Sequence, residues 1–181
     1  MPGVPEQEII DFFYKYEYDI HWRVVTMNDG FDFPSDIIMR QKQECNWNFL
    51  SRSGSLNWSE ELIENLKHYL VWGDKNSVGL SGNEFLPWSI ELIDKYRDFW
   101  NWSFLSQNKS LPWSEELIDE FFSYWDWYRL SANPSLPFTV KFIDKYYNHF
   151  SPSYLAENEG VFVNTLQFWG EDEINGILQK K

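Results

Sequence analysis

The sequence contains a segment that repeats itself after 25 residues, and this repeat limits the folds open to the chain. Residues 100–119 read WNWSFLSQNKSLPWSEELID, and residues 125–144 read WDWYRLSANPSLPFTVKFID. The Trp-x-Trp pair, the Leu-Ser dipeptide, the Asn and the Leu-Pro dipeptide recur at the same spacing in both segments. Because self-similarity at a fixed period of this length is typical of repeat proteins, the sequence predicts an array of small stacked units.

The same 25-residue register extends over most of the chain. Trp22 and Trp47 lie 25 residues apart. The Leu-Pro-Trp-Ser motif also occurs at Leu86–Ser89, five residues later in the chain than the 25-residue register predicts. We therefore predict six copies over residues 22–158, with the last one eroded, and assign the five extra residues to an insertion at 71–75. A capping helix within 1–21 and a C-terminal cap over 159–181 complete the prediction of a single array over 1–181.

Each copy is predicted to contain two short helices, which we name helix A and helix B. Both follow an N-cap residue whose side-chain oxygen accepts a backbone N–H, and the apolar residues of helix A recur at helical spacing. Helix B ends at an Asn, for which we expect the left-handed backbone conformation that closes helices. The N-caps of helix A are Ser59, Ser89, Ser114 and Thr139, those of helix B are Asn46, Asn101, Asp126 and Ser151, and the closing residues are Asn28, Asn83, Asn108, Asn133 and Asn158. The predicted fold class is all-α, an α-solenoid of about six short two-helix repeats with terminal caps.

The repeat motif can be written Trp-x-Trp-x-x-Leu-Ser-x-Asn-x-x-Leu-Pro-Trp-Ser, followed by Leu-Ile and an acidic residue. This pattern resembles the tandem tryptophan-rich repeats found in proteins of bacteria and large DNA viruses. The resemblance covers Trp22 to Asn158. It implies a repeat architecture, and it implies no biochemical activity.

The composition restricts the partners of the chain. With 28 acidic against 15 basic residues the formal net charge is −13, which disfavours binding to nucleic acids and anionic membranes and suits a basic protein partner. Aromatic residues make up 20% of the chain, which indicates an ordered protein. The single cysteine, Cys45, excludes an internal disulfide framework, and the N-terminus lacks the features of a signal peptide. No apolar run is long enough to span a membrane, so we expect a cytoplasmic protein.

Catalytic motifs are missing from the sequence. His21, His68 and His149 fall at unrelated positions of the repeat, so no spacing of a metal site or a catalytic triad is visible. The serines of the Leu-Ser dipeptides recur in copy after copy, which indicates a structural role, and no glycine-rich phosphate loop occurs. We therefore expect a protein without enzymatic activity, cofactor or bound metal.

Three groups of residues are candidates for contact with a partner. The first group lies in or beside the predicted insertion and comprises Trp72, Asp74 and Lys75. The second is a line of aromatic residues that we place at one position of helix B, next to its Leu, and it comprises Phe104, Tyr128 and Tyr154. The third is a row of carboxylates, one after each Leu-Ile or Phe-Ile pair, and it comprises Glu64, Asp94, Asp119 and Asp144. A solvated helix face is the simpler explanation of this acidic row, and Lys95 and Lys145 partly offset its charge. The Trp-x-Trp pairs themselves are interpreted as core, because they recur in phase with the apolar residues.

The sequence favours a non-enzymatic scaffold that binds a protein, such as an inhibitor or immunity-type protein that recognises a basic surface. One alternative is a small-molecule-binding protein that holds a nucleotide-like or sugar-like ligand in an aromatic pocket near Trp72. The other is an acidic mimic of nucleic acid. Neither the partner nor the oligomeric state follows from the sequence.

Overall fold

The computed structural model describes residues 6–165 and is all-helical over this range. The only paired extended residues among them are Asp74 and Ser77, which form an isolated bridge. The helices are α1 (Glu6–Lys15), α2 (Trp22–Val25), α3 (Ser35–Arg40), α4 (Trp47–Leu50), α5 (Glu60–Leu66), the 3-10 helix η1 (Gly79–Gly82), α6 (Ile90–Lys95), α7 (Trp102–Leu105), α8 (Glu115–Glu120), α9 (Trp127–Ala132), α10 (Val140–Tyr146), α11 (Pro152–Glu157) and α12 (Glu159–Asn164). The predicted all-α repeat fold is confirmed. Within this range no helix is long and apolar enough to cross a membrane, and the predicted C-terminal cap lies outside the described residues from residue 166 onward.

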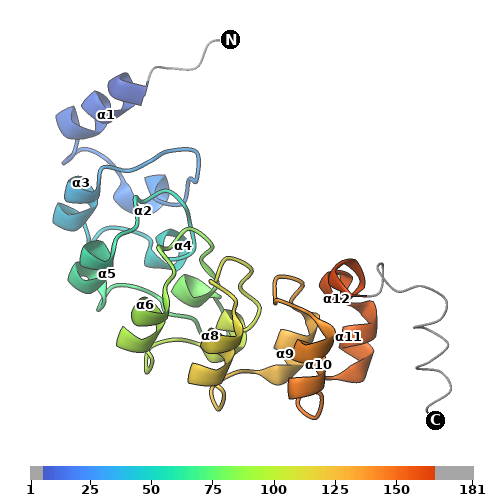
Figure 1. Cartoon of the computed structure of the whole chain (residues 1–181). Coiled ribbons are helices and arrows are strands. Elements are labelled where there is room, and N and C mark those ends of the chain that lie inside the picture. The colour runs from blue at the N-terminus through green and yellow to red at the C-terminus, as the bar shows by residue number, and fades with distance from the viewer. Residues whose placement is uncertain (1–5, 166–181) are drawn as a thin grey trace, which may run out of the picture. The chain divides into compact units, whose positions relative to one another are not determined.

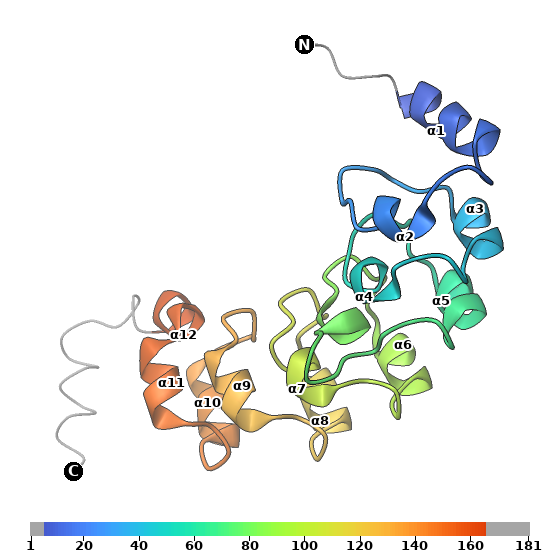
Figure 2. The same cartoon turned by 180° about the vertical axis from the view of Figure 1, so that it is seen from behind.

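The chain forms two compact units, Met1–Asn101 and Trp102–Lys181. In the first unit α3, α5 and α6 follow one another along one side, and α2 and α4 lie along the other (Figures 1 and 2). In the second unit α9 and α11 pack against each other. The regular spacing of the short helices supports the repeat in each unit, while the single array over 1–181 stays a prediction.

Helix A begins where the sequence predicts it. The side-chain oxygen of Ser114 accepts the backbone N–H of Leu117 at 3.1 Å, which satisfies one of the unpaired donors at the helix start. Leu117 and Ile118 are fully buried behind this cap. The same bond is made in three further copies, by Ser59, Ser89 and Thr139.

The first helix of the chain occupies the place of helix A in the first copy. Phe13 of α1 lies 25 residues before Ile38 of α3, and both side chains are buried. Phe13 packs against Trp22 at 5.7 Å between ring centroids, so α1 covers the following helix B. The segment predicted as an N-terminal capping helix thus contains α1, and this helix belongs to the repeat pattern.

The copies are joined by a hydroxyl group at the end of each helix B. Ser131 is completely buried; its Oγ donates to the carbonyl oxygen of Trp127 at 2.7 Å and accepts the N–H of Ser151 at 2.8 Å. The accepted N–H belongs to the residue that precedes helix B of the next copy, 20 residues along the chain. Equivalent bonds join Thr26 to Asn46, Ser51 to Val71, Ser81 to Asn101 and Ser106 to Asp126. The recurrence of serine is thus explained by packing between copies.

The hydroxyl that joins neighbouring copies also affects how helix B is capped. Asn46 and Ser151 precede α4 and α11 as predicted, but their side chains accept no capping hydrogen bond. Asp126 does cap α9, because its carboxylate accepts the N–H of Arg129 at 3.2 Å. The hydroxyl of the preceding copy therefore orders the start of helix B more regularly than the N-cap side chain does.

None of the asparagines after helix B is left-handed, so the prediction of a left-handed conformation is wrong, and Asn83, Asn133 and Asn158 are extended. Asn133 has φ −81° and ψ 113°, and no described residue other than glycine has a positive φ. The buried side chain of Asn133 instead donates through Nδ2 to the carbonyl oxygens of Ser106 and Asn108, at 3.1 and 3.2 Å. Asn83 and Asn158 make corresponding bonds to the preceding copy. Asn is needed here because its amide can pair with backbone carbonyls 25 or more residues away.

Nine tryptophans within residues 6–165 donate their indole N–H groups to backbone carbonyls. The donors to a carbonyl five residues earlier are Trp22, Trp47, Trp58, Trp72, Trp88, Trp113 and Trp127. Trp100 and Trp125 donate to a carbonyl seven residues earlier and are each 5% exposed, so they are core as predicted. Trp127 is only half-buried, and it packs against helix A of the next copy.

Trp72 occupies the first position of helix B, and the prediction of an insertion at 71–75 is therefore wrong by two residues. Its indole N–H donates to the carbonyl of Lys67 at 3.1 Å, the same five-residue bond that other copies make. Its ring packs at 4.7–5.2 Å against Tyr96, Phe99 and Trp100.

The extra residues come after Trp72 and interrupt helix B of this copy. The hydroxyl of Ser81 donates to the Trp72 carbonyl nine residues earlier, whereas Ser131 reaches Trp127 only four residues earlier. This difference of five residues equals the number of residues by which this copy is longer than the 25-residue period. Residues 73–78, which we name the inserted turn, replace the start of the helix, and η1 replaces its end.

Candidate functional site

The acidic row predicted from the sequence is partly used for contacts between copies. Its members are Glu64, Asp94, Asp119 and Asp144. Asp119 accepts hydrogen bonds from Lys145 Nζ at 2.8 Å and from the Tyr146 hydroxyl at 2.7 Å. Glu64 accepts a bond of 2.7 Å from the hydroxyl of Tyr96 in the same way. In both cases the donors come from helix A of the following copy, so these carboxylates hold neighbouring copies together.

The other two members of the row differ from this pattern. Asp94 forms an ion pair with Arg97, three residues further along the chain and just beyond the end of α6. Asp144 is exposed and forms no ion pair within residues 6–165. The row therefore does not present four equivalent free carboxylates, and its role in partner binding stays a prediction.

The tyrosine–carboxylate contacts shift the acidity of both partners. Hydrogen bonds from Lys145 and Tyr146 lower the pKa of Asp119, and bonds from Lys67 and Tyr96 lower that of Glu64. Burial, with the acceptor Glu64 as a further cause, raises the pKa of Tyr96 to about 12. The folded chain thus favours charged carboxylates and neutral tyrosines at these contacts.

The substitution Tyr96→Phe tests this contact through its pH dependence. The folded pKa of Tyr96 lies above its usual value of 10.0, so its contribution to stability is complete below pH 10 and is lost as the pH rises towards about 12. We expect the fall in stability over this window, measured by urea unfolding, to become shallower in Tyr96→Phe. Near neutral pH the variant is expected to lose about 1 kcal/mol.

Phe121 occupies the repeat position of Tyr96 in the fifth copy and is buried, so a phenyl ring without the hydroxyl fits the packing there. Tyr147→Phe serves as the control, because Tyr147 is 59% exposed, and this variant should keep the profile of the parent protein. An unchanged alkaline profile in Tyr96→Phe would show that the hydroxyl contributes nothing to the contact.

The aromatic line predicted in helix B is not a line at one repeat position. Tyr128 lies 24 residues after Phe104, and Arg129 is the residue at the equivalent position. Tyr128 and Tyr154 instead form a pair of neighbouring copies, with their hydroxyls 2.5 Å and their ring centroids 4.4 Å apart. Phe104 is half-buried in α7. The structure therefore joins two of the three residues.

The inserted turn borders a surface hollow of about 510 Å³ in the first unit. Asp74 organises the turn: its Oδ1 accepts the N–H groups of Asn76 and Ser77 at 2.7 and 3.0 Å. Gly79 closes the turn with φ 54°, and a Cβ there would lie 2.2 Å from the carbonyl oxygen of Val71, so a side chain would clash with the backbone. The hollow is lined by Met27, Asn46, Asn48, Phe49, Arg52, Asp74, Asn76 and Ser77.

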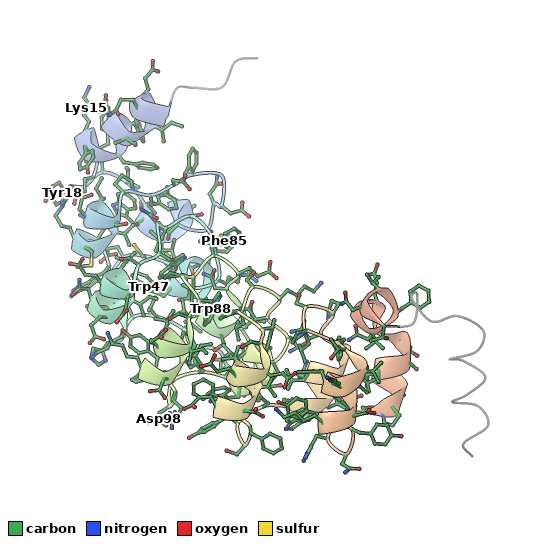
Figure 3. The ribbon with its side chains drawn as sticks, in the orientation of Figure 1. Lys15, Tyr18, Trp47, Phe85, Trp88 and Asp98 are labelled. Atoms are coloured by element: carbon green, nitrogen blue, oxygen red, sulfur yellow. The ribbon has the colours of Figure 1, made fainter. Side chains whose placement is uncertain are left out.

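A second hollow of about 530 Å³ shares Phe49 and Arg52 with the first. Phe85 borders it, and this side chain is 65% exposed although its ring lies against Gly54, where a Cβ would be 3.0 Å from the ring. Figure 3 shows Phe85 on the side of the first unit where loops connect the helices. The remaining lining residues are Asp29, Ser53 and Gly54. Because they share two residues, the hollows adjoin, and we name them together the Phe49 groove.

Of the candidates predicted beside the insertion, only Asp74 lines this groove. Trp72 is packed into the repeat, and the exposed Lys75 is not among the lining residues. The sequence did carry a signal for Phe85 that our prediction missed. The equivalent positions of other copies hold small residues, namely Gly30, Ser55, Ser110, Ser135 and Gly160.

The described residues offer little for metal binding or nucleophilic chemistry. No group of three His, Cys, Asp or Glu side chains within residues 6–165 could hold a metal ion. Burial raises the pKa of the Cys45 thiol to about 12, with a smaller effect of Glu44, and the thiol donates to the carbonyl of Gln41. A thiol with so high a pKa is a poor nucleophile at neutral pH.

Comparisons with protein-family models, curated proteins and solved structures gave no match for this chain.

Proposed function

We propose that this protein is a non-enzymatic repeat scaffold that binds a basic surface of another protein. The observation that supports this proposal is the imbalance of unpaired charges on the surface. Serine and asparagine side chains of the repeat motif form hydrogen bonds within or between copies, but many exposed carboxylates do not. The exposed acidic residues that form no ion pair or side-chain hydrogen bond within residues 6–165 are Glu8, Asp19, Asp29, Asp32, Glu44, Glu61, Glu84, Asp98, Glu116, Glu120, Asp144, Glu157 and Glu159.

The basic residues within 6–165 fall into two groups. Six are held in ion pairs with carboxylates of the same chain, namely Arg40, Lys67, Lys95, Arg97, Arg129 and Lys145. Seven form no ion pair within these residues, namely Lys15, Arg23, Lys42, Arg52, Lys75, Lys109 and Lys141. The thirteen unpaired carboxylates therefore outnumber the unpaired cations, and the exposed surface carries an excess of negative charge. Such a surface attracts a basic partner at long range and rejects acidic ones. A cytoplasmic location and an inhibitor or immunity-type role are part of the same proposal, and they rest on the single Cys45 and on the charge.

The test is capture of partners by the full chain from a lysate of the organism that encodes it. The lysate is treated with nuclease, the bound proteins are eluted with increasing salt, and they are identified by mass spectrometry. We expect one basic protein in stoichiometric amount, released as salt screens the charges. Captured proteins that are acidic, or a complex indifferent to salt, would contradict the proposal.

A second candidate function is the binding of a small molecule, and the Phe49 groove is the observation that favours it. Its amide, aromatic and charged side chains are of the kinds that line ligand sites. A compound that remains bound through native purification, detected by mass spectrometry, would support this function. Nucleic-acid mimicry is weaker, because Glu64 and Asp119 are occupied by tyrosine and lysine side chains.

A further inference from the structure

We infer that the Phe49 groove binds an extended, basic peptide segment of the partner protein. This inference rests on the proposed function, and it names the place and the form of the contact. The groove lies where the repeat is interrupted, since the inserted turn forms one wall and α4 forms the other. Because the motif residues are used to join the copies, a departure from the motif is where an additional role is expected.

The polar side chains of the groove match the backbone of a peptide. Asn46, Asn48 and Asn76 line it, and their side-chain amides form no hydrogen bond within the described residues. An asparagine amide carries one carbonyl acceptor and two N–H donors, so it can pair with both groups of a peptide bond. An extended segment exposes such groups at every residue, and helical segments do not.

The apolar residues provide surfaces for the side chains of such a segment. Met27 is 52% and Phe85 is 65% exposed, and the Arg52 guanidinium lies 5.1 Å from the centroid of the Phe49 ring. Met27 and Phe49 border the first hollow, and Phe49 and Phe85 the second. Alternate side chains of an extended peptide can therefore enter two adjoining hollows on the two sides of the Phe49–Arg52 pair.

The charges of the groove determine which peptide is favoured. Asp74 uses Oδ1 for the inserted turn, and its Oδ2 forms no bond within the described residues; Asp29 is exposed and forms none. Arg52 is the single basic lining residue and can donate to backbone carbonyls of the peptide. Carboxylates thus outnumber cations at the groove, which favours lysine or arginine side chains.

The experiment is an NMR titration of the full chain with two blocked pentapeptides. One alternates leucine with arginine, and the other alternates leucine with glutamate. We expect the arginine peptide alone to shift the side-chain amide signals of Asn48 and Asn76. The double variant Asp29→Asn with Asp74→Asn should weaken its binding about tenfold. Asn at position 74 keeps the oxygen that accepts the two turn N–H groups, so the turn is expected to persist.

The matched control removes two exposed carboxylates outside the groove, through Asp98→Asn with Glu116→Gln. Figure 3 shows Asp98 at the opposite side of the first unit from Phe85. Both double variants change the net charge equally, so a loss confined to the groove variant supports a local site. Equal loss in both variants would overturn the groove inference and leave the proposed basic partner standing. Binding of neither peptide, or equal binding of both, would also overturn it, and the captured protein would then decide separately whether the partner is basic.

Discussion

Replacement of Asn133 with Ala is expected to lower the free energy of unfolding by about 3–5 kcal/mol. The side chain is 3% exposed; its Nδ2 donates to Ser106 and Asn108, and its Oδ1 accepts the N–H of Ser135 at 3.0 Å. Truncation removes three hydrogen bonds. The Asn108 carbonyl keeps the indole N–H of Trp113 as a donor, whereas the carbonyl of the buried Ser106 loses its bond to Nδ2. Urea unfolding of the full chain, followed by far-ultraviolet circular dichroism, measures the loss.

Two further variants separate this explanation from a general effect of removing an asparagine. Asn28 holds the same repeat position in the first copy but is exposed, and it accepts only the N–H of Gly30. Asn28→Ala should therefore change stability by less than about 1 kcal/mol. Asn133→Asp keeps the oxygen that accepts the Ser135 N–H but replaces the Nδ2 donor with an oxygen that faces two carbonyl oxygens. Because oxygen acceptors repel one another, this variant should lose at least as much stability as Asn133→Ala. A stable Asn133→Asp protein would show that the amide donors are not needed.

The asparagines also show why part of the fold could not be predicted. The N-caps of helix A were predicted correctly because the acceptor and the donor lie three residues apart, as in Ser114 and Leu117. The partners of Asn133 lie 25 and 27 residues earlier, so the local sequence is compatible with either a helix-closing conformation or a link between copies. Only the stacking of the copies decides between them.

The inserted turn was misplaced for a related reason. Leu70, Val71 and Trp72 all fit a helical apolar pattern, and the 25-residue register alone does not reveal which of them ends the regular spacing. The bond from the Trp72 indole to Lys67 resolves this, because it repeats the five-residue geometry of the other copies. A register read from the first Trp of each helix B would have placed the insertion after Trp72.

The Phe49 groove was the least predictable feature. Its lining residues come from separate segments, including Met27 after α2, Phe49 in α4, Asp74 in the inserted turn and Phe85 after η1. Two of these segments depart from the repeat in the sequence: the insertion around Asp74, and Phe85, where a large aromatic replaces the small residues of the other copies. Positions that break the repeat are therefore better guides to these surface hollows than positions that obey it.

Replacement of Trp125 with Ala is expected to lower the free energy of unfolding by about 3–5 kcal/mol. Its indole is 5% exposed and donates to the carbonyl of Ile118 at 3.2 Å. The ring packs at 5.0 and 5.1 Å, between centroids, against Trp102 and Trp113. The substitution leaves a large cavity among aromatic side chains that cannot close without moving the helices. We expect a lower urea midpoint with a nearly unchanged dependence on urea, since the unfolded surface stays similar.

The neighbouring Trp127→Ala provides the matched comparison, since it removes the same side chain two residues away. Trp127 is half-buried, and its indole N–H lies 3.4 Å from the carbonyl oxygen of Phe122, a long bond. It retains ring contacts with Tyr146 and His149, at 5.4 and 5.0 Å. Because less apolar surface is withdrawn from water, the loss should be about 1–2 kcal/mol. Equal losses in the two variants would mean that stacking between copies stabilises the fold as much as burial does. It would then be wrong to treat Trp125 as a core residue and Trp127 as a residue that only links neighbouring copies.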